Sequence, residues 1–102
     1  MKKMEVSSLK RKASKLREEL FQLGPVMRGS VVVIGTKNKQ PYFSLNKDKK
    51  TKIIYLGKKR EPIANEYSAN YKRLVEIVDE MTLVNMELLK RNAVESHEEE
   101  PT

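Results

Sequence analysis

The fold is decided by residues 31–56, which read VVVIGTKNKQPYFSLNKDKKTKIIYL. Three short runs in this stretch, VVVI, YFSL and IIYL, are rich in β-branched and aromatic residues and are typical of β-strands. Short loops rich in Gly, Asn, Pro and Lys separate the runs. Connections this short favour antiparallel pairing, because parallel strands need long crossovers. The stretch therefore predicts a three-stranded antiparallel meander.

The residues before the meander predict a helix. Between residues 6 and 23, apolar residues recur at alternating spacings of three and four, which places them on one helical stripe. Ser7 or Ser8 is the predicted N-cap, since a hydroxyl can accept a hydrogen bond from a free backbone N–H. Gly24 and the proline after it end the pattern.

The residues after the meander predict a second, longer helix over residues 62–91. Pro62 fits the first turn of such a helix, where its missing N–H costs nothing. We therefore expect an α+β fold: an N-terminal helix, the meander, and a long C-terminal helix that packs on the N-terminal one. With 102 residues, the chain is expected to form a single domain over residues 1–93, followed by a flexible acidic tail over residues 94–102.

The second helix also carries a heptad pattern. In this pattern Asn85 falls at a core position, where a polar side chain can fix the register of a helix bundle; the alternative is an exposed or frayed turn. The helix is longer than its expected partner, so we predict a homodimer built as a four-helix bundle. The predicted oligomer interface consists of Tyr71, Leu74, Val78, Met81, Val84, Asn85 and Leu88.

Charge points to a polyanionic partner. The chain holds 21 Lys and Arg against 14 Asp and Glu, a net charge of +7. Residues 35–60 alone hold nine basic residues and one acidic residue, a net charge of +8. We predict a nucleic-acid-binding protein, for DNA or RNA, that contacts phosphates through these basic groups. The candidate residues are Lys37, Lys39, Lys47, Lys49, Lys50, Lys52, Lys58, Lys59, Arg60, Tyr42 and Tyr55.

Strand alternation assigns the side chains to two faces. Phe43, Leu45, Ile54 and Leu56 are expected to face the helices, which leaves Tyr42, Ser44, Ile53 and Tyr55 on the outer face. Tyrosine rings on an open sheet can stack on bases. Two alternatives stay open: the tyrosines serve packing, and the lysines serve solubility by discouraging aggregation of strand edges.

Few residues in the chain suit catalysis or metal binding. Cysteine is absent and His97 is the one histidine, so the usual zinc sites and a positioned general base are not expected. We predict a protein that is not an enzyme and has no cofactor and no metal. No apolar run is long enough to span a membrane, and no export signal is visible, so a cytoplasmic location is expected. The alternative function is a protein–protein interaction or assembly module that docks through the long helix.

The chain resembles a family of small uncharacterised prokaryotic proteins with a helix–three-strand–helix pattern, often encoded near mobile elements. The resemblance covers roughly residues 27–90 and rests on the segments RGS (28–30), PYFSL (41–45), KIIYLGK (52–58) and NYKRL (70–74). Members of that family often carry cysteines in the first hairpin loop, which implies metal binding. Here the loop reads TKNKQ (36–40) and has no cysteine, so the metal role does not transfer.

Overall fold

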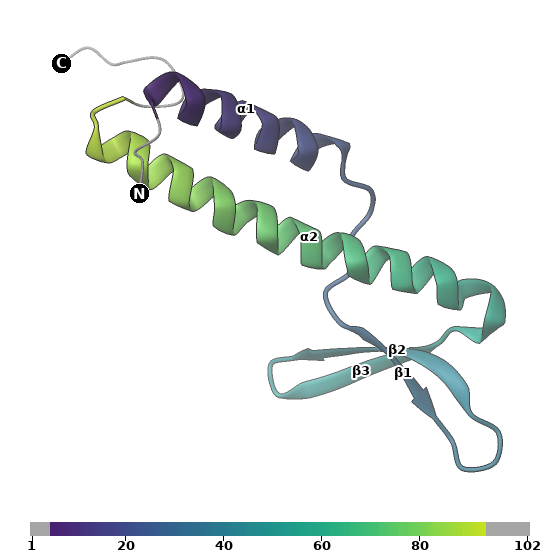
Figure 1. The fold of residues 1–102 in the computed structure, drawn as a ribbon. Helices are drawn as coiled ribbons and strands as arrows, with labels where there is room; N and C mark the ends of the chain where they lie inside the picture. The colour runs from purple at the N-terminus through teal and green to yellow at the C-terminus, as the bar shows by residue number, and fades with distance from the viewer. Residues whose placement is uncertain (1–4, 94–102) are drawn as a thin grey trace. The chain divides into compact units, whose positions relative to one another are not determined.

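The computed structural model describes residues 5–93 and contains two helices and three strands (Figure 1). Strands β1 and β2 pair antiparallel, as do β2 and β3, and the sheet order is β1-β2-β3. The predicted meander and the predicted α+β order of helix, strands and helix are therefore confirmed. The predicted acidic tail, residues 94–102, lies outside the described residues. The elements are α1 (Val6–Gln22), β1 (Ser30–Ile34), β2 (Gln40–Lys47), β3 (Lys50–Tyr55) and α2 (Gly57–Lys90).

The described residues group into two compact units. The helical unit joins residues 5–23 to residues 74–93, and the sheet unit comprises residues 24–73. Helix α2 contributes its first half to the sheet unit and its second half to the helical unit. The expectation of a single domain over residues 1–93 stays a prediction.

Within the helical unit, α1 lies along the second half of α2 (Figure 1), and an apolar seam of buried side chains holds the two helices together. Leu20 and Met81 pack against the edge of this seam. The periodic spacing of apolar residues in both helices brings these side chains to facing stripes. The predicted packing of the two helices is thus confirmed. The buried residues of the seam are Leu9, Ala13, Leu16, Ile77, Val84 and Leu88.

The buried stripe of α2 is rotated relative to the predicted heptad. Val78, a residue of the predicted interface, is 47% exposed, whereas its neighbour Ile77 is 0% exposed. Two apolar stripes overlap on this helix, and α1 covers the one that reads Ile77, Met81, Val84 and Leu88. Burying that stripe encloses a continuous apolar row, and the polar Asn85 lies at its edge.

Helix α1 begins at residue 6, where the apolar pattern starts, but its N-cap differs from the predicted one, and α2 begins earlier than predicted. Residue Glu5 is the N-cap of α1 and makes no side-chain cap hydrogen bond, so the prediction that Ser7 or Ser8 caps the helix is wrong. Ser8 lies inside the helix, and its Oγ accepts a hydrogen bond from Arg11 at 3.4 Å. Helix α2 begins at Gly57, which puts Pro62 in its second turn, where one backbone hydrogen bond is lost.

The end of α2 is stabilised by a local ion pair. Arg91 Nε donates a hydrogen bond to Glu87 Oε2 at 2.9 Å, and Lys90 Nζ lies 3.6 Å from Glu87 Oε1. The hydrogen bond from Arg91 is the main reason that the pKa of Glu87 is lowered, with the charge of Lys90 acting in the same direction. Arg91 also ties back to the helix through its backbone N–H, which donates to the Leu88 carbonyl at 3.2 Å.

Candidate nucleic-acid interface

The register of the sheet places Phe43 on the face that packs against α2 within the sheet unit. Phe43 is 6% exposed and forms a small core with Leu56 and Ala64, and Leu45 packs against that core. The expected inward orientation of these strand residues therefore agrees with the structure. Ile54 pairs directly with Phe43, but it is 56% exposed because β3 is an edge strand.

The outer face of the sheet carries the two tyrosines. Tyr42 and Tyr55 are cross-strand partners, and their rings meet edge to face with centroids 5.5 Å apart. The Tyr55 hydroxyl donates a hydrogen bond to Gln40 Oε1 at 3.1 Å. This arrangement favours the packing alternative, since the two rings contact each other and the Tyr55 hydroxyl has a protein partner. Stacking of bases on these rings stays a prediction.

Three of the predicted lysines gather at one end of the β2–β3 hairpin. Lys47 pairs with Lys50, and Lys52 pairs with Leu45, so the three side chains share the face of Phe43. Together with Asp48 they line a hollow of about 280 Å³. The residues at the turn, Asp48 and Lys49, both have positive φ angles of 53° and 63°, as in a type I′ turn. A two-residue turn of this kind holds the lysines of both strands close together.

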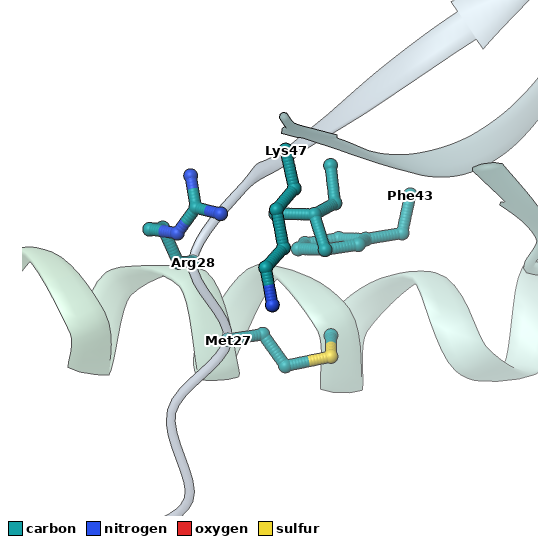
Figure 2. Close-up of a pocket in the computed structure, with 5 residues that line it drawn as sticks. Met27, Arg28, Phe43 and Lys47 are labelled. Atoms are coloured by element: carbon teal, nitrogen blue, oxygen red, sulfur yellow. The ribbon is translucent and has the colours of Figure 1, made fainter. Parts of the chain in front are cut away.

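A second hollow of about 430 Å³ adjoins the first along the same face. Its apolar lining comes from Met27, Phe43 and Leu45, and its cations are Arg28 and Lys47. Figure 2 shows Phe43 and Lys47 reaching from β2 toward Met27, with the Arg28 guanidinium on the other side of Lys47. Because Lys47 lines both hollows, the two form one continuous surface. We call this surface the hairpin face; its cations are Arg28, Lys47, Lys50 and Lys52.

The segment that carries Arg28 is held against α2 by hydrogen bonds at both of its ends. Asn70 Nδ2 donates to the Pro25 carbonyl at 2.8 Å, and the Met27 N–H donates to the carbonyl of Tyr67 at 3.1 Å. The Ser68 hydroxyl donates to the Gly29 carbonyl at 3.0 Å.

Gly29 brings this segment into close contact with β2. Its φ angle is 151°, and a Cβ at this position would lie 2.5 Å from the Ser44 carbonyl oxygen. Only glycine therefore allows the approach that sets Arg28 beside the hollow. Sequence reasoning did not select Arg28 as a site residue. The pairing of Ser30 with Ser44 brings it there, and no sequence pattern indicates that register.

The other predicted basic residues are exposed but do not share these hollows. Lys37 and Lys39 lie in the β1–β2 loop, at the opposite end of the sheet from the β2–β3 turn (Figure 1). The Leu56 N–H donates to the Pro41 carbonyl at 3.0 Å, so α2 begins at that same end. There Lys58, Lys59 and Arg60 occupy the start of α2, and Arg60 Nε donates to the Leu56 carbonyl at 2.9 Å. Lys49 is exposed at the tip of the β2–β3 turn.

The charge of the chain divides along the boundary between the units. The sheet unit, residues 24–73, holds twelve Lys and Arg against three Asp and Glu, a formal charge of +9. The rest of the chain holds nine Lys and Arg against eleven Asp and Glu, a formal charge of −2. The hairpin face therefore lies in the unit that carries the positive charge of the protein.

The predicted oligomer interface is divided between the core and the surface. Val84 and Leu88 are buried against α1, and Met81 packs beside them. Val78 is exposed, and the Asn85 Oδ1 is buried with no hydrogen-bond partner among the described residues. Two further members of the predicted set, Tyr71 and Leu74, are half-buried. The interface itself stays a prediction.

Within residues 5–93, no group of three or more His, Cys, Asp or Glu side chains is placed to hold a metal ion. The helices of this described part are not long and apolar enough to cross a membrane. Comparisons with protein-family models, curated proteins and solved structures give no match to the chain. The resemblance noted from the sequence accordingly stays a prediction.

Proposed function

We propose that the protein is a non-enzymatic nucleic-acid-binding protein that contacts phosphates through the hairpin face. The observation that carries the proposal is the convergence of Arg28, Lys47, Lys50 and Lys52 on adjoining hollows of one sheet face. Asp48 is the one acidic side chain that lines them. Cations gathered in this way bind a polyanion favourably, because they release the counterions condensed on its phosphates.

The backbone of the turn adds support. Lys49 occupies a left-handed conformation, at a position in a type I′ turn where glycine is strongly preferred. A lysine there costs stability and extends the cationic surface to the tip of the hairpin. Local violations of backbone preference are typical of functional sites. This position therefore favours a binding role over a purely structural hairpin.

The proposal is tested by reversing charge on the hairpin face. The variant K47E/K50E/K52E is compared with the matched control K10E/K12E/K15E, whose residues are exposed on α1 and undergo the same change in net charge. Binding of labelled single-stranded and duplex oligonucleotides is measured by fluorescence anisotropy across a salt series. We expect the hairpin variant to bind at least tenfold more weakly, and the slope of log affinity against log salt to fall in magnitude by about two to three.

Two outcomes contradict this proposal. The first is a wild-type protein that binds no oligonucleotide at low salt. The second is an equal loss of affinity in both variants, which would assign the effect to net charge rather than to the hairpin face.

A second candidate function is self-association through α2. Val75, Val78, Met86 and Leu89 are between 40% and 62% exposed, and they form an apolar stripe on the second half of α2. The unpartnered Asn85 Oδ1 lies beside this stripe. Exposed apolar rows of this kind are typical of protein–protein contacts. We propose that a second copy of the chain covers this stripe, because the stripe is self-complementary about its centre at Thr82.

A further inference from the structure

We infer that the hollow above Phe43 receives an unstacked base, so that the protein prefers single-stranded over duplex nucleic acid. This inference rests on the proposed function. The lining of the hollow is both apolar and cationic: Met27, Phe43 and Leu45 are apolar, and Arg28 and Lys47 supply positive charge. A nucleotide has the same combination, since it joins a flat, largely apolar ring system to an anionic phosphate.

The size of the hollow suits this occupant. Its volume is about 430 Å³, and it is wide open to solvent, so it can accept one face of a base without enclosing it. Met27 and Leu45 are only partly buried, so their side chains are accessible to a ring that enters from solvent, and both pack against the cluster that contains the buried Phe43. Bases of a duplex are stacked and paired, and only a single strand can present one without paying the cost of unstacking.

The neighbouring cations are placed to contact the phosphates of the strand that carries such a base. Lys47 lines the base-sized hollow and the smaller hollow beside it, which Lys50 and Lys52 also line. A strand whose base enters above Phe43 can thus place its adjoining phosphates along the hairpin. Aromatic or apolar contact with bases beside a basic groove is the general pattern of single-strand binding proteins.

The outer face is the less suitable surface for a base. Tyr42 and Tyr55 are packed edge to face on each other, and the Tyr55 hydroxyl is hydrogen-bonded to Gln40. A base stacked there would compete with these existing contacts. The hollow on the Phe43 face offers room without that competition.

The test compares four probes on the wild-type protein at one salt concentration. They are a short thymidine strand, the same strand in a duplex, an abasic phosphodiester strand of equal length, and thymidine monophosphate. We expect the thymidine strand to bind about tenfold more tightly than the abasic strand, since one base contact of this kind corresponds to that factor. The monophosphate should bind far more weakly than the strand, because it lacks the neighbouring phosphates.

Variants then localise the effect. Met27→Ala and Leu45→Ala remove apolar walls of the hollow and leave the charge unchanged, and Val26→Ala is the control because Val26 is exposed and outside the lining. Affinity for the thymidine strand should fall severalfold in the first two variants only, and affinity for the abasic strand should stay constant in all three. In the wild-type protein, the Met27 methyl NMR signal should shift with the thymidine strand and not with the abasic one.

The possible failures are distinguishable. If no probe binds, the proposed function itself fails. If the thymidine and abasic strands bind equally, binding is purely to phosphates, and the inference fails while the proposed function stands. If the monophosphate binds as tightly as the strand, the hollow is a site for free nucleotides and the preference for strands is wrong.

Discussion

Lys49 shows how one residue balances stability against charge. Its φ angle of 63° lies in the left-handed region, where a side chain meets the following carbonyl group and costs about 1–2 kcal/mol. Glycine avoids that cost at this position of the turn. The chain instead places a lysine at the tip of the hairpin whose strands carry Lys47 and Lys50.

Replacing this lysine separates the two effects. We expect Lys49→Gly to raise the free energy of unfolding by about 0.5–1 kcal/mol, because relief of the backbone cost exceeds the added freedom of the unfolded chain. Chemical denaturation followed by circular dichroism measures the change. The same substitution should weaken oligonucleotide binding modestly. Lys39→Gly is the control, since Lys39 is an exposed loop residue without a positive φ angle, and it should not gain stability.

At this scale, the sequence indicated part of the candidate site. The run of lysines in residues 47–52 was visible directly, and strand alternation correctly grouped Phe43 with Leu45. Arg28 was not selected, because its place beside the hollow depends on strand pairing and on the close approach at Gly29. Such contacts join residues far apart in the sequence, and local pattern does not encode them.

Helix α2 carries two apolar stripes, and only the fold decides which one is buried. A difference of one position separates Ile77, which is fully buried, from Val78, which is half exposed. The predicted heptad includes Met81 and Leu88 of the buried row but takes Val78 instead of Ile77, since the spacing of three and four fits both rows. Helix α1 decides which row is buried, because its residues Leu9, Ala13 and Leu16 pack on the row that contains Ile77.

Alanine substitution at the two adjacent positions tests this phase. Ile77→Ala should lower the free energy of unfolding by about 2–4 kcal/mol, because it opens a cavity in the seam between α1 and α2. Val78→Ala is the matched control; measured at a protein concentration where the chain is monomeric, so that the proposed dimer does not contribute, it should change the free energy of unfolding by less than about 0.5 kcal/mol. Thermal unfolding of both variants is the measurement. Equal destabilisation by the two substitutions, or a larger effect at Val78, contradicts the described phase.

The order and type of the elements were predictable because each has a strong local signature. Runs of β-branched and aromatic residues and short charged loops specified the meander, and spacings of three and four specified both helices. Helix ends were less predictable. The preference of proline for the first turn of a helix suggested a start at residue 62. Helix α2 instead starts at Gly57, two residues after the end of β3 at Tyr55. Helix α2 runs through Pro62 with the loss of one backbone hydrogen bond, and Ala64, two residues further on, is buried in the sheet core.

At the scale of the whole molecule, charge and apolar surface lie in different units. The sheet unit carries the +9 charge and the hairpin face, and the helical unit, with little net charge, carries the exposed stripe of α2. Association through the helical unit would leave the basic units of both copies available for a polyanion. A dimer would then bind a long strand at two points, and its apparent affinity would exceed that of one copy without any new contact.

The exposed stripe of α2 is self-complementary about its centre. Val78 and Met86 lie four residues on either side of Thr82, and Val75 and Leu89 lie seven residues on either side. In an antiparallel pair with two-fold symmetry about Thr82, each valine of one copy faces the larger side chain of the other. The Thr82 hydroxyl already donates to the Val78 carbonyl at 2.8 Å, so it can be buried at the centre without losing a partner.

We therefore expect a homodimer that depends on this stripe. Light scattering coupled to size-exclusion chromatography should give twice the mass of the chain for the wild-type protein and the mass of one chain for M86K/L89K, because two buried ammonium groups per copy prevent association. Leu83→Lys is the control: Leu83 is 67% exposed but lies on a different side of α2, so this variant should stay dimeric. A wild-type monomer at high concentration contradicts the prediction, as does loss of the dimer in the Leu83 variant. Because it removes the dimer, M86K/L89K should also weaken binding to long strands while leaving binding to short ones unchanged, since only long strands reach both basic units of a dimer.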